Sequence, residues 1–298
     1  PPEVGLLRLP KRDGPTVNRP AGSRSAYVTL VTNRDYVVGA SALLRSLRRT
    51  GTDADLVVMC TPGVADDDLD ALKGFNPRLA RCARLQTSPG FNERHERGRL
   101  HKAAPFTKGG KPVFHTPLDN FVKLRLWQLT EYERVVFIDA DALVLQNCDR
   151  LFDYPEFCAA PNVYESLEDF HRLNSGVFTA RPDLATFDRM TRTLDTPDAF
   201  WRRTDQTFLE SFFPHWHGLP VFYNMLQYVW FNLPGLWSWE QLHILHYQYE
   251  KPWQAGHGKC ERLRPLIDLW QAFASGDGIP ADTTRLAGPA GQTDQQAS

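Results

Sequence analysis

The sequence predicts an α/β protein built on a mainly parallel sheet, and three observations support this. Two short apolar runs, residues 26–31 and 55–60, flank a stretch whose apolar residues recur with helical spacing. A third run of four apolar residues, 135–138, ends directly in a pair of aspartates. Buried strands that alternate with helices through short connections favour a parallel sheet with right-handed crossovers.

The first half of the chain shows this alternation most clearly. After the first strand, residues 37–49 carry apolar side chains on one face of a predicted helix, and Gly51 ends it. After the second strand, Pro62 and Gly63 turn the chain into a helix predicted over 65–73. This β-α-β-α order is the main basis of the parallel-sheet prediction.

The second half continues the pattern with less regular spacing. Its predicted elements are a helix over 121–129, the strand 135–138, a turn followed by a strand over 174–180, and helices over 184–194 and around 205–209. The segment 219–249 is heavy in aromatic residues, which suits either a core wall or a sugar-stacking surface. We expect it to form core.

Composition shifts suggest where the folded part begins and ends. Residues 1–24 are rich in Pro, Gly and Arg, so we expect an N-terminal arm or a disordered leader. Residues 25–274 form the predicted domain, and 275–298 have little to bury and are predicted to be a disordered tail. Residues 86–118 are too long for a plain connection, which leaves a surface insertion or a lid.

Overall composition excludes several classes of protein. Of the 298 residues, 42% are hydrophobic and 23% charged, and the net charge of −1 provides no broad basic surface for nucleic acid. No apolar run reaches the ~20 residues that span a bilayer, and no signal-peptide pattern is present. The five cysteines are scattered, without the paired spacing of a zinc site. We therefore expect a reducing, cytoplasmic environment.

The two aspartates at the end of the third run are the leading candidates for a ligand site. Ligands of open α/β sheets bind beyond the carboxyl ends of the strands. Asp139 and Asp141 are two residues apart, so in an extended chain their side chains lie on the same side. Two carboxylates suit Mg²⁺ or Mn²⁺. The alternative is that the pair only caps the following turn.

Five motifs in one order give the chain a family resemblance. They are residues 26–33 with Tyr36, Phe137-Ile138-Asp139-Ala140-Asp141, Asn174-Ser175-Gly176-Val177-Phe178, Asp205-Gln206 and Lys251-Pro252-Trp253. Together they resemble glycosyltransferase family 8, nearest its glycogenin and galactinol synthase branch, over about residues 25–255. The resemblance implies a single-domain GT-A-type fold with a Rossmann-like sheet. It also implies transfer of a hexose from a UDP-sugar with retention, using Mn²⁺ or, as the alternative, Mg²⁺.

The resemblance assigns roles to residues at the nucleotide end of such a site. The uridine-binding positions of the family match Leu30, Thr32, Asn33 and Tyr36, although Thr and Asn at a strand end also serve as helix caps.

The metal-binding positions match Asp139 and Asp141, and Asp139 with Ala140 also lies in the donor-binding set. His246 is the expected third metal ligand, and His243 is expected to pack.

Further matches lie at the diphosphate and sugar end. Lys251 matches a phosphate-binding lysine, but the glycine usual between the histidine and this lysine is replaced by Gln248 or Tyr249, and the spacing is one residue short.

The remaining matches surround the transferred sugar. Asn174 and Ser175 match residues that hold this sugar. Asp205 and Gln206 match a pair that lies beneath its anomeric carbon, and Lys123 matches a lysine near the sugar. Asp169 is a weaker candidate. Retention through a covalent intermediate and retention by same-face attack both stay open.

Two other functions compete with transfer. An apolar strand followed by Asp-x-Asp also opens haloacid dehalogenase-like phosphatases, but there the motif lies near the start of the domain, with Thr or Val where this chain has Leu143. The other alternative is a nucleotide-sugar-binding protein without catalysis.

The resemblance also bears on the acceptor. Glycogenin glucosylates its own tyrosine, and the nearest positions here are Trp230 or Phe231, which have no hydroxyl, with Tyr228 close by. We therefore expect UDP-glucose or UDP-galactose as donor and a separate polyol or saccharide as acceptor. Oligomeric state stays open.

Overall fold

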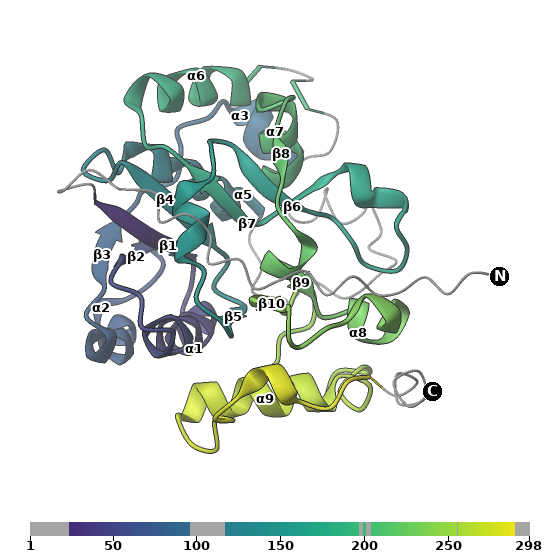
Figure 1. Ribbon diagram of the computed structural model, residues 1–298. Coiled ribbons are helices and arrows are strands. Elements are labelled where there is room, and N and C mark those ends of the chain that lie inside the picture. The colour runs from purple at the N-terminus through teal and green to yellow at the C-terminus, as the bar shows by residue number, and fades with distance from the viewer. Residues whose placement is uncertain (1–23, 96–116, 197–198, 201–203, 255, 290–298) are drawn as a thin grey trace.

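A seven-stranded sheet organises the computed structural model (Figure 1). The residues described are 24–95, 117–196, 199–200, 204–254 and 256–289. The strands are β1 (Ser25–Val31), β2 (Asp55–Cys60), β3 (Arg78–Arg81), β4 (Arg134–Ile138), β6 (Cys158–Pro161), β7 (Leu173–Ala180) and β8 (His217–Gly218), in the spatial order β3-β2-β1-β4-β7-β6-β8. Only β7 runs against its neighbours. The predicted α/β fold with a mainly parallel sheet is therefore confirmed.

Helices cover both faces of this sheet. They are α1 (Asp35–Arg49), α2 (Asp66–Leu69), α3 (Pro89–His95), α5 (Pro117–Asn120), α6 (Leu184–Leu194), α7 (Asp205–Phe212), α8 (Val229–Asn232) and α9 (Arg264–Ser275). The predicted helices over 37–49, 184–194 and around 205–209 are confirmed. The helix predicted over 121–129 is instead a 3-10 helix, Phe121–Gln128, because its apolar spacing fits three residues per turn as well as 3.6.

One sequence prediction about β7 is wrong. A turn followed by a strand was expected over residues 174–180, but the whole segment is buried strand. A Cβ on Gly176 would lie 2.5 Å from His246 Nδ1, so a side chain here would collide with the imidazole. The glycine marks the close approach of a neighbouring side chain inside a strand, not a turn.

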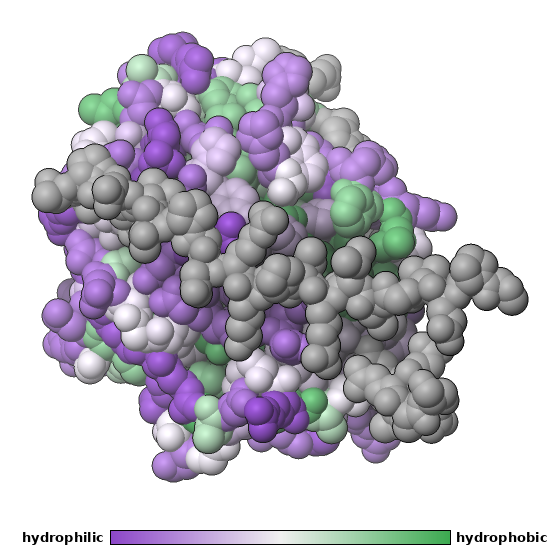
Figure 2. All heavy atoms as spheres, in the orientation of Figure 1, coloured by the Kyte–Doolittle hydropathy of each residue, from purple (hydrophilic) through white to green (hydrophobic). Residues whose placement is uncertain are grey.

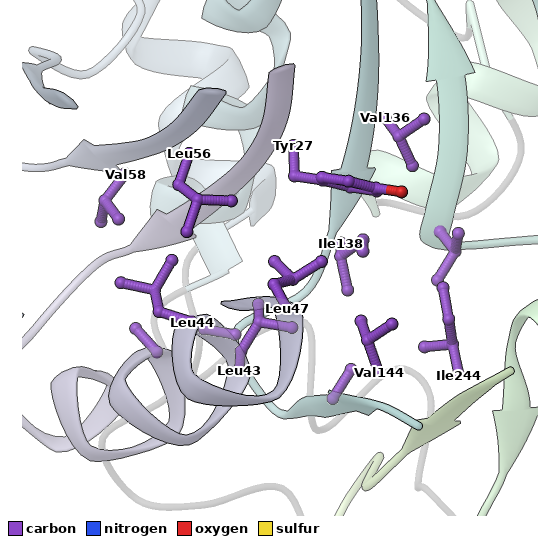
Figure 3. Close-up of a cluster of buried hydrophobic side chains, with 14 of the residues drawn as sticks. Tyr27, Leu43, Leu44, Leu47, Leu56, Val58, Val136, Ile138, Val144 and Ile244 are labelled. Carbon is purple, nitrogen blue, oxygen red and sulfur yellow. The ribbon is translucent and has the colours of Figure 1, made fainter. Parts of the chain in front are cut away.

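The apolar stripe of α1 packs directly on the sheet. Figure 3 shows Leu43, Leu44 and Leu47 pointing from the helix toward Leu56 and Val58 of β2. All five side chains are at most 2% exposed. This packing fixes α1 against the sheet, and the first residues of α1 thereby stand beside the carboxyl end of β1.

A small second sheet brings the C-terminal half to the end of β4. It consists of β5 (Ala142–Val144), β10 (Ile244–His246) and β9 (Met225–Leu226), in that spatial order. His246 pairs with Ala142, immediately after the Asp-Ala-Asp turn. The aromatic segment 219–249 supplies most of the buried cluster that joins this sheet to α9, so its assignment to core is confirmed.

The C-terminal boundary differs from the predicted one. Residues 276–289 pack on the fold: Trp239 Nε1 donates to Ala287 O (2.9 Å), and Ile279 and Leu286 contact the aromatic cluster. The prediction of a disordered tail from residue 275 is wrong for this segment, because two apolar residues and backbone acceptors suffice to anchor it.

Three predicted segments lie wholly or partly outside the described residues. Residues 1–23 and 290–298 fall there entirely. The 86–118 insertion is described only at its ends, where α3 packs through the buried Phe91 and His95. Within the described residues, no helix is long and apolar enough to cross a membrane.

Candidate active site

Asp139 and Asp141 lie in a turn that three strands hold in place. Asp139 N donates to Gly176 O of β7 (2.8 Å), and Ala142 N donates to Asp139 O (3.2 Å). Tyr247 N, just after β10, donates to Asp141 O (2.8 Å). The turn is therefore fixed on both sides by backbone hydrogen bonds, and the two carboxylates emerge at the carboxyl end of β4, as predicted.

His246 joins the two carboxylates. One ligand atom from each of the three side chains lies within 4.8 Å of the others. His246 Nε2 is 3.3 Å from Asp141 Oδ1 and 3.9 Å from Asp139 Oδ2. Two carboxylate oxygens and one imidazole nitrogen form a donor set that suits Mn²⁺, and the oxygens alone also suit Mg²⁺. The residues present therefore fit a divalent cation.

Asn224 orients the imidazole, a role that the sequence did not reveal. His246 Nδ1 donates to Asn224 Oδ1 (2.9 Å), and this bond leaves the lone pair of Nε2 facing the carboxylates. Asn224 Nδ2 donates in turn to Asn174 Oδ1 (2.9 Å). All three side chains are at most 4% exposed. The only signal for Asn224 in the sequence is a polar residue inside an aromatic run, which does not point to a partner.

Asn174, expected to hold the transferred sugar, is engaged with the protein. Its Nδ2 donates to Asn162 Oδ1 (3.1 Å) and to the Tyr164 hydroxyl (3.2 Å). Its Oδ1 accepts from Gly176 N (2.9 Å) as well as from Asn224. The side chain thus ties β7 to the His246 support, in addition to any contact with a ligand.

Lys251 lies at the metal end of the site. Its ammonium group pairs with Asp141 and donates to Tyr247 O (3.0 Å), and the side chain is buried. Burial by itself would raise the pKa of Asp141, but the charge of the buried Lys251 outweighs it and holds that pKa well below its ordinary value. Asp141 is therefore an anionic carboxylate at neutral pH.

Lys123 bridges the metal end to α7. Its Nζ lies 3.1 Å from Asp139 Oδ1 and 2.9 Å from Asp205 Oδ2, and it donates to Ser175 O (3.1 Å). Burial lowers its pKa, but the two carboxylates more than compensate, so the net shift is upward and the lysine stays charged. The predicted catalytic residues Lys123 and Asp205 are thus in direct contact.

The first turn of α7 carries the remaining predicted pair. Thr204 caps the helix by accepting from Thr207 N (3.2 Å). Asp205 Oδ2 also accepts from Ser175 Oγ (3.0 Å), and Gln206 Oε1 accepts from Ser175 N (3.3 Å). The helix N-terminus and Lys123 both favour the anionic form of Asp205. Asp205 therefore occupies the first turn of α7 and contacts Lys123 at the same time.

The expected nucleotide-binding residues meet at the start of α1. Leu30 lies in β1 and Thr32 directly follows that strand, and both are buried. Asn33 Oδ1 accepts from Asp35 N (3.0 Å) in the turn before α1, whose N-cap residue, Arg34, makes no side-chain capping bond. The Tyr36 ring lies edge-on to Trp253, with the ring centroids 6.0 Å apart.

A second glycine allows these segments to meet. A Cβ on Gly39 in α1 would lie 2.5 Å from Ala140 O and 2.8 Å from the Trp253 ring. The start of α1, the Asp-Ala-Asp turn and the Lys-Pro-Trp segment therefore converge around one glycine. Neither Gly39 nor the Trp253 ring had a predicted role.

His243 was expected to pack, and Asp169 was a weaker candidate for a sugar contact. His243 packs on Tyr223, with ring centroids 4.6 Å apart, and its Nδ1 lies 2.7 Å from Gln241 O, so its assignment to packing is confirmed. Asp169 lies in the β6–β7 connection, near enough for its charge to act on the Tyr164 hydroxyl.

The sequence matches one protein family and several known proteins. Residues 27–256 match the family described as glycosyl transferase family 8. The chain is 31% identical over 240 residues to UDP-glucuronate:xylan alpha-glucuronosyltransferase 2 of Arabidopsis thaliana, covering 77% of this chain but 36% of that enzyme. It is 33% identical over 206 residues to human glycogenin-1, covering 67% of this chain and 53% of the relative. The chain thus spans between a third and about half of these relatives.

Solved structures agree on the fold. A galactosyltransferase in complex with donor and acceptor sugar analogues superposes with a TM-score of 0.52 at 14% identity, over 82% of this chain and 95% of that one. The glycosyltransferase GlyE of Streptococcus pneumoniae superposes with a TM-score of 0.57 at 15% identity, over 85% of this chain and 63% of that one. At such identities the likeness is one of fold.

Proposed function

The chain belongs to glycosyl transferase family 8, and on that premise we propose that it moves a sugar from a UDP-sugar to a separate hydroxyl acceptor. The observation that carries this proposal is the Asp139–Asp141–His246 cluster at the carboxyl end of β4, with a buried lysine on either side. Such a cluster supplies a cation site for a diphosphate, and the lysines add fixed positive charge beside it.

The metal end is proposed to hold the diphosphate. A divalent cation, Mn²⁺ or alternatively Mg²⁺, would be held by Asp139, Asp141 and His246 and would act as a Lewis acid that stabilises the departing UDP. Lys251 is already bound to Asp141, so its ammonium group lies where it can bind a phosphate oxygen. It keeps this charge in place before the reaction begins, which is the most effective form of electrostatic stabilisation.

The sugar end is proposed to hold the transferred sugar. Asp205 and Gln206 lie in the first turn of α7, and Ser175 bonds to both. We propose retention at the anomeric carbon. The covalent route needs a nucleophile beneath that carbon, and Asp205, held in position by Lys123, would supply it. Same-face attack relies instead on the leaving phosphate, and there Asp205 and Gln206 would stabilise the positive charge that develops at the anomeric carbon.

We propose a separate acceptor because Tyr228, the tyrosine nearest the position that glycogenin glucosylates, is buried. All nine lie in the described part of the chain, and each is buried or at most partly exposed. Tyr228, nearest the self-glucosylation position of glycogenin, is 1% exposed, and its hydroxyl is bonded to Glu250 and Lys259. A glycosidic bond at this oxygen would require local unfolding.

The acceptor surface is proposed to be the connection between β6 and β7. Figure 2 shows hydrophobic side chains gathered over this connection, where Leu167 and Phe170 are more than half exposed. Tyr164 opens the connection and bonds to Asn174. A saccharide offers apolar ring faces and hydroxyl edges, so aromatic and polar groups side by side suit it. A small polyol is the alternative acceptor.

The experiment is a panel of donors assayed for UDP release. UDP-glucose and UDP-galactose are the first donors, and UDP-glucuronate is added because the xylan glucuronosyltransferases are relatives. Each is incubated with Mn²⁺, alone and with saccharide and polyol acceptors. We expect slow hydrolysis of one donor and a large stimulation by an acceptor. UDP binding without release from any donor would favour the binding-protein alternative.

Intact mass spectrometry after the same incubations tests the acceptor separately. We expect no added sugar mass on the protein. A hexose on Tyr228 would contradict the separate-acceptor proposal while leaving the transferase proposal intact.

A further inference from the structure

The loop that joins the metal ligand His246 to Lys251 is held by a glutamine from another segment. Gln227 Nε2 donates to Gln248 O (2.6 Å) and to Glu250 O (3.0 Å), on either side of Tyr249. Tyr249 has φ +63°, in the left-handed region that non-glycine residues rarely adopt. Such strain persists only where the surroundings enforce it, and the two bonds from Gln227 do so.

The Gln248 side chain in this loop is only half satisfied. Its Oε1 accepts from Gln227 N (3.1 Å). Its Nε2 is buried and has no hydrogen-bond partner among the residues that the structure describes, although the side chain is only 6% exposed. A buried amide NH₂ without an acceptor is costly, so such a group in a native protein calls for an explanation.

The place of Gln248 in the chain supplies that explanation. Gln248 follows His246, the last residue of β10, by two residues and lies in the loop between that residue and Lys251. Tyr247, between them, points its hydroxyl to Leu266 O (2.7 Å) in the aromatic core. Lys251, three residues on, reaches back to Asp141. Gln248 thus lies between two groups that face the proposed cation and diphosphate.

We propose that Gln248 is a donor-binding residue whose Nε2 hydrogen-bonds to a phosphate oxygen of the UDP-sugar. The inference rests on the function proposed above. Phosphate oxygens only accept hydrogen bonds and the NH₂ group only donates them, so the two are complementary. Because Gln227 fixes the loop from both sides of Tyr249, the backbone around Gln248 is ordered before the ligand arrives, which reduces the entropy lost on binding.

Calorimetry with two substitutions at Gln248 tests the proposal. Gln248→Leu removes the NH₂ group without adding charge, and Gln227 N keeps a backbone partner, His246 O (3.0 Å). Gln248→Glu retains the acceptor for Gln227 N and replaces the donor with an anionic oxygen. In the presence of Mn²⁺ we expect the Kd for UDP to rise about tenfold for Leu and up to about a hundredfold for Glu. The Kd for uridine, which has no phosphate, stays unchanged.

Controls separate this contact from a general defect. Gln241→Glu makes the same charge change at an exposed position and should bind UDP like the parent. The melting temperature and the Mn²⁺ affinity of Gln248→Leu, measured without UDP, should also match the parent. If the Gln248→Leu variant does not fold, the UDP affinity of the Gln248→Glu variant provides the test. Parent-like UDP affinity in a folded Gln248 variant would overturn the proposal, whereas failure of the parent to bind UDP would overturn the proposed function instead.

Discussion

Each end of the site has a buried lysine paired with carboxylates, but the two lysines are connected differently. At the metal end, Lys251 pairs with a single carboxylate, Asp141, which is itself a candidate metal ligand. At the sugar end, Lys123 bridges Asp139 to Asp205 and so joins the cation site to α7. In the proposed mechanism, the first lysine shares its partner with the cation and lies where it can bind a phosphate oxygen. The second would hold a carboxylate beside the transferred sugar. Substitutions at the metal end should therefore affect nucleotide binding, and those at the sugar end the transfer step.

The largest effect is expected from the metal ligands. Asp139→Asn or Asp141→Asn removes an anionic ligand with little change in shape, so UDP release should fall by at least about a hundredfold. A chelator should do the same to the parent protein. Asp268→Asn on the surface of α9 makes the same chemical change away from the site and serves as the control. Unchanged UDP release from the double Asn variant would remove the pair from the site.

The sugar end should give a comparable loss of rate without a loss of binding. Asp205→Asn removes the negative charge that Lys123 and Ser175 position. We expect transfer to fall by about a hundredfold to a thousandfold, with the Kd for UDP within about twofold of the parent. If UDP affinity instead collapsed as it does in the Asp141 variant, the two ends would not be functionally distinct.

Lys251 should show a smaller effect that appears in binding itself. Lys251→Ala should weaken UDP binding about tenfold to a hundredfold, corresponding to ~1.5–3 kcal/mol for a hydrogen bond to a charged group. Calorimetry in Mn²⁺ measures this directly, with the exposed Lys73→Ala as control. UDP affinity equal to that of the parent would place Lys251 outside the diphosphate site.

The smallest effect is expected from the packing behind His246. Gly176→Ala puts a Cβ 2.5 Å from His246 Nδ1, so the imidazole must shift. We expect Mn²⁺ affinity to fall about tenfold, the lower range for losing support behind a metal ligand. Gly218→Ala in β8 meets nothing within 4 Å and should bind Mn²⁺ normally. Equal Mn²⁺ affinity in both variants would show that His246 is not a ligand.

Local pattern was enough to predict the elements that carry the two aspartates. Apolar runs of strand length and the spacing in 37–49 report burial directly, so β1, α1, β2 and β4 follow from them. The cluster of Asp139, Asp141 and His246 was predicted as well, but the position of the histidine came from a family resemblance. No spacing rule places residue 246 beside residue 139.

What could not be predicted depends on contacts between distant segments. Gly176 has the sequence signature of a turn, and only the neighbouring imidazole shows why a strand needs it. Asn224 is polar among aromatic residues, and its bond to His246 arises from the pairing of β9 with β10. Tyr249 lies where the family resemblance leads one to expect a glycine, and it still has a left-handed backbone. Gln227 stabilises this conformation by donating to the carbonyls of Gln248 and Glu250.

The central claim is that a cation held by Asp139, Asp141 and His246 binds the diphosphate of a UDP-sugar. The most direct measurement is a calorimetric titration of UDP into the protein, with Mn²⁺ and after chelation. The account predicts saturable binding with Mn²⁺, and binding weakened at least about tenfold after chelation or in Asp141→Asn. UDP affinity that is equal with and without the cation would contradict it.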